Sequence, residues 1–123
     1  IHQENIYPYP KQKSDLDVGL PEGTGDDEYL GRLRRILPSI LEFHKPELVI
    51  YLAGTDPYKD DRLGSLALTK EGMRQRDEMV LSRCFYKQIP VAVLLAGGYA
   101  YDFKDTIQLH VNCLRVAREL FSW

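Results

Sequence analysis

Residues 91–103 read VAVLLAGGYAYDF, an apolar run of six residues that ends in two glycines and a tyrosine. Residues 49–64, VIYLAGTDPYKDDRLG, repeat this arrangement with an aspartate after the glycine. A short, continuous apolar run bounded by turn residues is typical of a strand in a buried parallel sheet. The two stretches therefore predict strands over residues 47–53 and 91–96, each followed by a polar residue that could carry chemistry.

Helical patterns lie before, between and after these strands. Apolar residues recur at helical spacing in three segments, and we expect their starts to be capped by Asp26 or Asp27, by Thr69, and by Asp105 or Thr106. Pro38 should kink or divide the first helix. Residues 1–25 are rich in proline and glycine and should be irregular, apart from a short strand or arm in DLDVGL. Two strands joined by a helical crossover predict an α/β fold with a parallel sheet covered by helices on both faces.

The composition argues against several classes of function. A formal net charge of -2 gives no electrostatic footprint for nucleic acid, and we expect Arg32, Arg34 and Arg35 to be a solvated helix face. No apolar run reaches the ~18 residues of a membrane helix. Cys84 and Cys113 form no CxxC pair, which is typical of a reduced, cytoplasmic protein.

Asp56 and Tyr99 each follow a predicted strand, so both should lie at the carboxyl edge of the sheet, where open α/β sheets bind ligands. Asp56 precedes Pro57 and is either a turn aspartate that accepts loop amides, the plainer explanation, or a metal ligand or acid–base group. Tyr99 is either a half-buried packing residue or a hydroxyl presented to a ligand. Gly97 and Gly98 favour the second role, because a double glycine suggests close approach of another group.

The other polar candidates have plainer explanations. His110 and Cys113 lie three residues apart on the third predicted helix and could share a metal, but their apolar neighbours indicate a satisfied core histidine. We expect His110 to share a buried face with Ile107 and Leu114. Residues 60–62, Asp-Asp-Arg, should be a solvated loop, or a pocket rim if the loop lies at the catalytic edge.

Taken in order, these motifs resemble the histone deacetylase superfamily, which includes the acetoin-utilisation and acetylpolyamine amidohydrolase proteins. AGTDPYKDDRLGSLALTKEGMRQRD and IPVAVLLAGGYAYD carry the resemblance, and IHQENIYPYP and DVGLPEGTGDDEYL are similar to the family at corresponding places. AGTD and DDEYL lean towards the class IV and bacterial branch. The resemblance implies a zinc amidohydrolase on an arginase-like α/β fold, incomplete here, with residues 1–123 as the C-terminal part of a single catalytic domain.

The resemblance also implies roles for individual residues. Asp56 matches the aspartate of the family's AGxD motif, which is a zinc ligand. Tyr99 matches the tyrosine of the family's GGY motif, which donates a hydrogen bond to the developing oxyanion. Gly97 and Gly98 match the glycines before that tyrosine, Leu63 matches a position that lines the acyl-lysine channel, and the resemblance implies that all three belong to the substrate channel.

The family takes its other zinc ligands and its general base from an Asp-x-His motif and a histidine pair upstream of the IHQ segment. Zn²⁺ would therefore need ligands from outside this chain. A monovalent cation site for K⁺ would use main-chain oxygen near Ile1, and His2 matches a structural histidine. Two hypotheses follow. The intact protein is a zinc-dependent deacetylase of acetyl-lysine or acetylpolyamine, or the chain is a non-catalytic unit that packs on a partner or self-associates through an exposed apolar sheet.

Overall fold

The computed structural model describes residues 1–121. Along these residues the elements follow one another in the order β1, β2, α1, β3, α2, β4 and α3. Their bounds are β1 His2–Gln3, β2 Gly19–Leu20, α1 Asp26–His44, β3 Val49–Leu52, α2 Lys70–Tyr86, β4 Val91–Leu94 and α3 Phe103–Phe121. None of the helices within residues 1–121 is long and apolar enough to cross a membrane.

β3 and β4 form a parallel sheet with α2 as the crossover between them. Val49 pairs with Val91 and Leu52 with Leu94, and beyond the strands the Ala53 N–H donates to the Leu94 carbonyl oxygen at 2.8 Å. Because the strands are parallel, the loops that follow Leu52 and Leu94 leave the same edge of the sheet. The predicted pair of parallel strands is therefore confirmed.

A second, very short parallel pair joins β1 to β2. His2 pairs with Gly19 and Gln3 with Leu20, so the DLDVGL stretch does contribute a strand. The Gln3 side-chain oxygen also accepts a hydrogen bond from the Ser65 N–H at 2.7 Å. This bond attaches the N-terminal segment to the loop that follows β3.

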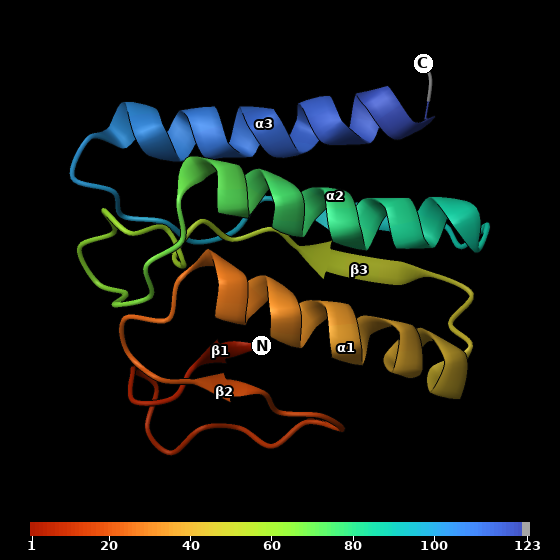
Figure 1. The fold of residues 1–123 in the computed structure, drawn as a ribbon, viewed down its shortest axis with the longest axis horizontal. Coiled ribbons are helices and arrows are strands. Elements are labelled where there is room, and N and C mark those ends of the chain that lie inside the picture. Colours follow the sequence, from red (N-terminus) through yellow and green to blue (C-terminus); the bar gives the residue numbers. More distant parts are fainter. Residues whose placement is uncertain (122–123) are drawn as a thin grey trace.

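The three helices share one hydrophobic core. In Figure 1, α3, α2 and α1 lie side by side. Tyr51 of β3 packs against this core, whereas Ile50, which is 63% exposed, and Leu52 alternate with it and face the other way. Within residues 1–121 the sheet is therefore covered on one face and not on both, as had been predicted. The α/β fold is incomplete, as expected. The helical residues of the core include Tyr29, Leu30, Leu33, Met73, Val80 and Leu109.

The helix starts differ in part from the prediction. Gly25, and neither Asp26 nor Asp27, is the N-cap of α1. The Asp26 carboxylate instead accepts hydrogen bonds from the Thr69 N–H at 2.9 Å and hydroxyl at 2.6 Å. Thr69 caps α2 as predicted, because its hydroxyl oxygen accepts a hydrogen bond from the Gly72 N–H at 3.0 Å. α1 runs through Pro38 without a break, so this proline does not divide the helix.

α3 buries a different face from the one predicted. Leu109, Cys113 and Val116 are buried, at the i, i+4 and i+7 spacing of one helical face. Ile107 and Leu114 are exposed. The predicted face was wrong because α3 carries two apolar stripes, and α2 packs against α3 on the other one.

Candidate active site

The two strand-end loops are joined by side-chain hydrogen bonds to the main chain. The Asp56 carboxylate, in the loop after β3, accepts a hydrogen bond through Oδ1 from the Gly98 N–H at 3.0 Å. The Thr55 hydroxyl donates to the Gly97 carbonyl oxygen at 3.3 Å. The structure therefore brings Asp56 beside the glycine turn that carries Tyr99.

Positions 97 and 98 require glycine, both because of their backbone conformation and because neighbouring side chains leave no room for a Cβ atom. Their φ angles are 54° and 116°, in the region that side-chain-bearing residues rarely adopt. A Cβ atom on Gly97 would overlap the Asp56 carboxylate, and one on Gly98 would overlap the Thr55 hydroxyl. The double glycine thus allows close approach of the two loops, as predicted from the sequence.

Asp56 is the described residue best placed to bind a metal. Its side chain is exposed, and within residues 1–121 no hydrogen bond reaches its Oδ2 atom. No group of three or more His, Cys, Asp or Glu side chains in that part of the chain is arranged to hold an ion. Since zinc sites use three or four protein ligands, Asp56 fits as one ligand of a larger set.

A cavity of about 510 Å³ opens beside Asp56. Asp56 and Leu63 both line it, together with Ile1 and His2 from the N-terminal segment. Leu63 is exposed, as a residue lining an open channel would be. Tyr99 lies outside the cavity wall within residues 1–121, and its side chain is 52% exposed.

A buried ion pair holds the backbone just before Asp56. Arg76 of α2 donates to the Gly54 carbonyl oxygen at 2.7 Å and to the Asp77 carboxylate at 2.7 and 2.9 Å. The Tyr51 hydroxyl donates to the same carboxylate at 2.5 Å, and burial raises the pKa of this phenol. These residues were missed in the sequence, although Arg76 and Asp77 lie at helical spacing on the same face as Met73, which could have indicated a buried pair.

Asp61 was expected to be solvated, and this expectation was wrong. Its side chain is only 7% exposed. Oδ1 accepts hydrogen bonds from the N–H groups of Leu63 at 2.9 Å and Gly64 at 2.8 Å, and Oδ2 accepts one from the Tyr99 N–H at 2.6 Å. The charged residue is buried because backbone donors from two loops surround its carboxylate.

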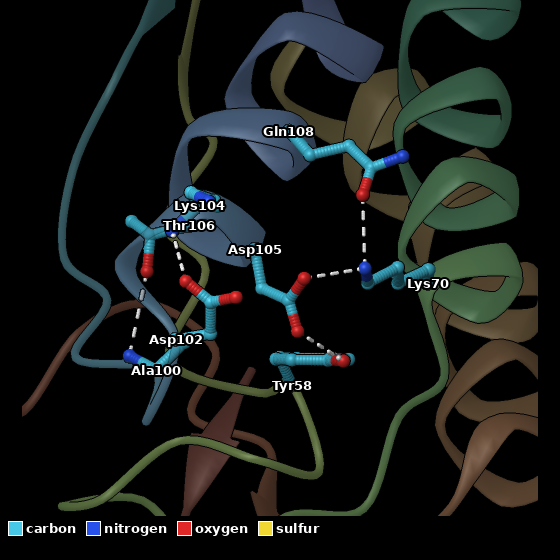
Figure 2. Close-up of polar contacts among 8 residues, drawn as sticks. All are labelled: Tyr58, Lys70, Ala100, Asp102, Lys104, Asp105, Thr106 and Gln108. Atoms are coloured by element: carbon cyan, nitrogen blue, oxygen red, sulfur yellow. Dashed lines mark hydrogen bonds and ion pairs between the residues drawn. The ribbon is translucent and has the colours of Figure 1, made fainter.

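A polar cluster attaches the start of α3 to α2 and to the loop after β3 (Figure 2). The Tyr58 hydroxyl donates to Asp105 at 2.9 Å, and the Lys70 ammonium donates to Asp105 at 2.5 Å and to Gln108 at 2.8 Å. The hydrogen bonds from Lys70 and then Tyr58 lower the pKa of the Asp105 carboxyl. Asp105 therefore serves as a bridge between segments and not as the helix cap that was predicted.

The start of α3 also binds the turn that carries Tyr99. Asp102 precedes the helix and accepts a hydrogen bond from the Lys104 N–H at 3.0 Å, so it has the capping role expected of Asp105 or Thr106. The Thr106 hydroxyl oxygen accepts a hydrogen bond from the Ala100 N–H at 3.3 Å, and Figure 2 shows both bonds. The residue after Tyr99 is thus fixed to α3.

His110 and Cys113 belong to no group of three or more potential metal ligands in the part of the chain that the structure describes. Cys113 is buried, and burial raises its pKa to about 12, so the thiol is protonated and a poor ligand at neutral pH. His110 is half-buried, and its Nδ1 atom has no hydrogen-bond partner within residues 1–121. We expected the ring nitrogens of His110 to be hydrogen-bonded, and this expectation was wrong for Nδ1.

The fold and the strand-end loops define a protein of the arginase–deacetylase class of α/β folds. The structure superposes on the acetylpolyamine aminohydrolase of Burkholderia pseudomallei with a TM-score of 0.78 and 18% identity, over 95% of this chain and 35% of that one. It also superposes on the histone deacetylase Clr3 with a TM-score of 0.62 and 25% identity, over 84% of this chain and 16% of that one.

The chain belongs to the histone deacetylase family, since the model of the histone deacetylase domain matches residues 1–114. It is 45% identical over 121 residues to an uncharacterized protein of Picosynechococcus sp., covering 98% of this chain and 40% of the relative. It is 38% identical over 102 residues to histone deacetylase 2 of Arabidopsis thaliana, covering 80% of this chain and 26% of the relative. The chain thus spans less than half the length of these two relatives.

Proposed function

We propose that the intact protein is a zinc-dependent deacetylase that hydrolyses an acylated amine, either acetyl-lysine or an acetylpolyamine. The observation that carries the proposal is the hydrogen bonding of the two Asp56 carboxylate oxygens. One of its oxygens is held by the Gly98 N–H, and the other is free of donors within residues 1–121. Family membership and the fold shared with an acetylpolyamine aminohydrolase support the same reaction class.

Asp56 would hold the zinc through its free oxygen, with further ligands from outside residues 1–121. The bound ion would polarise the amide carbonyl and lower the pKa of a bound water. The hydrolysis adds that water across the amide C–N bond and releases a carboxylic acid and a free amine. The resemblance also suggests K⁺ at the main-chain oxygen of Ile1, which lines the same cavity.

Tyr99 would donate its hydroxyl hydrogen to the carbonyl oxygen as negative charge develops there. Its phenol makes no hydrogen bond within residues 1–121 and is half-exposed, so the donor is available. Gly97 and Gly98 let the turn approach Asp56, and Leu63 on the cavity wall would contact the acylated side chain.

The substitution Asp56→Asn in the intact protein tests this proposal. Zinc content is measured by atomic absorption and turnover with an acetyl-lysine peptide and an acetylated polyamine. We expect the variant to lose both zinc and turnover, because an amide is a much weaker zinc ligand than a carboxylate. Asp27→Asn, at an exposed aspartate in the first turn of α1, is the matched control and should keep both. Full zinc content with normal turnover in Asp56→Asn would refute the proposal.

A second candidate is a non-catalytic unit that self-associates. The observation in its favour is the uncovered face of the β3–β4 sheet, where Ile50, Leu52 and Leu94 are all exposed. An apolar sheet face of this kind is expected to associate with another surface. The two candidates differ in their dependence on metal, since a packing unit has no need of zinc.

A further inference from the structure

The Asp61 carboxylate lies buried between two loops, and its hydrogen-bond donors among residues 1–121 are all backbone N–H groups. Oδ1 accepts from the Leu63 and Gly64 N–H groups, which belong to its own loop. Oδ2 accepts from the Tyr99 N–H at 2.6 Å, the shortest of the three bonds. A buried carboxylate that accepts several N–H groups makes charge-assisted bonds, which are shorter and stronger than neutral ones.

The backbone of Tyr99 is held on both sides by this loop. Its N–H donates to Asp61, and its carbonyl oxygen accepts from the Arg62 N–H at 3.0 Å and from the Arg62 side chain at 3.2 Å. The Tyr101 N–H donates to the Asp60 carbonyl oxygen at 3.0 Å. The main chain around Tyr99 is therefore fixed, while its phenol is exposed and without a hydrogen bond within residues 1–121.

We propose that Asp61 is a positioning residue. By holding the backbone of Tyr99, it keeps the Tyr99 hydroxyl within hydrogen-bond distance of the oxyanion. This inference rests on the proposed function. A donor stabilises an oxyanion only when it lies about 2.7–3.1 Å from that oxygen. A shift of about 1 Å in a reacting group can cost on the order of a hundredfold in rate. Since the phenol makes no hydrogen bond to any residue in the range 1–121, the position of its hydroxyl depends on the backbone that Asp61 holds.

The substitution Asp61→Asn in the intact protein should remove the hydrogen bond to the Tyr99 N–H and keep those to the Leu63 and Gly64 N–H groups. An asparagine has the same shape, but one of its two terminal atoms is a nitrogen that cannot accept a hydrogen bond. The amide oxygen should face the Leu63 and Gly64 N–H groups, because these supply two hydrogen bonds. The amide nitrogen would then lie against the Tyr99 N–H. This donor–donor contact should push the turn away from its position.

We expect kcat to fall about 10- to 100-fold in Asp61→Asn, with KM changed less than about threefold and zinc content unchanged. Turnover is measured per mole of bound zinc, so that loss of folded protein does not count as loss of catalysis. Asp61→Ser, a smaller acceptor, is the second variant if Asp61→Asn gives little folded protein. Asp27→Asn is again the matched control and should keep normal turnover.

The decisive measurement is the double variant with Tyr99→Phe. If Asp61 acts through the Tyr99 hydroxyl, Asp61→Asn should lower kcat by less than about twofold once that hydroxyl is absent. Fully additive losses, an effect confined to KM, or normal turnover in Asp61→Asn would each overturn the positioning role. The single variant Tyr99→Phe tests the proposed function separately. Normal turnover in this variant would refute the oxyanion role of Tyr99, and the role of Asp61 with it.

Discussion

Two tyrosines in this chain provide a matched test of the proposed chemistry. Tyr99 is 52% exposed and its hydroxyl has no hydrogen bond within residues 1–121, whereas Tyr58 is 3% exposed and its hydroxyl donates to Asp105 at 2.9 Å. The substitutions Tyr99→Phe and Tyr58→Phe each remove one hydroxyl and leave the ring in place. The structure therefore predicts opposite effects on turnover and on stability.

Tyr99→Phe should lower kcat by about 100- to 1000-fold, or about 2.7–4 kcal/mol, the usual effect of losing one oxyanion donor. Its Tm should not change, because an exposed hydroxyl without a partner contributes nothing to folding. Tyr58→Phe should lower the unfolding free energy by about 1 kcal/mol, since the Asp105 carboxylate loses the hydrogen bond that the buried Tyr58 hydroxyl donates. Its kcat should change by less than about threefold, because Tyr58 lies in the cluster at the start of α3.

The assay is deacetylation of an acetyl-lysine peptide by the intact protein, alongside thermal and urea unfolding of both variants. Zinc content is measured in each sample and should be equal in all. The reasoning is refuted if Tyr99→Phe turns over at the wild-type rate, or if its loss of turnover is matched by an equal loss of stability. It is also refuted if Tyr58→Phe shows the larger fall in kcat.

Two further predictions concern the glycine turn and the uncovered sheet. Gly97→Ala should lower zinc content and turnover together, because its Cβ atom would displace the Asp56 carboxylate, and a normal zinc content would contradict this. In sedimentation of the 123-residue chain, we expect self-association that Ile50→Lys weakens and that Phe43→Lys, a control at an exposed site on α1, leaves unchanged. A monomeric wild-type chain would rule out the second candidate function.

The parallel strands and the placement of Asp56 and Tyr99 were predictable because their signals are local. An apolar run followed by a glycine turn determines both where a strand ends and which residues follow it. The burial of Asp61 and Arg76 was not predictable in this way. A charged side chain becomes buried only when donors or acceptors from distant segments meet it, as the Tyr99 N–H meets Asp61 and the Gly54 carbonyl meets Arg76.

The face of α3 shows a second limit of sequence patterns. Leu109 and Cys113 form one apolar stripe, and Ile107 and Leu114 form another. Helical periodicity identifies both stripes but does not say which one a neighbouring helix will cover. Packing against α2 decides that question, and this contact joins segments far apart in the sequence.

The hydrogen bonds that hold the two strand-end loops determine which side chains of this site can be substituted without disturbing the loops. Most of them end on main-chain atoms: the Gly54 carbonyl oxygen and the N–H groups of Leu63, Gly64, Gly98 and Tyr99. Such atoms are present at a position whatever residue other than proline it carries. Leu63 can therefore be exchanged for any residue except proline without loss of the N–H that the Asp61 carboxylate accepts. If Leu63 lines the acyl channel as proposed, a library randomised there in the intact protein should alter acyl preference and leave folding unchanged.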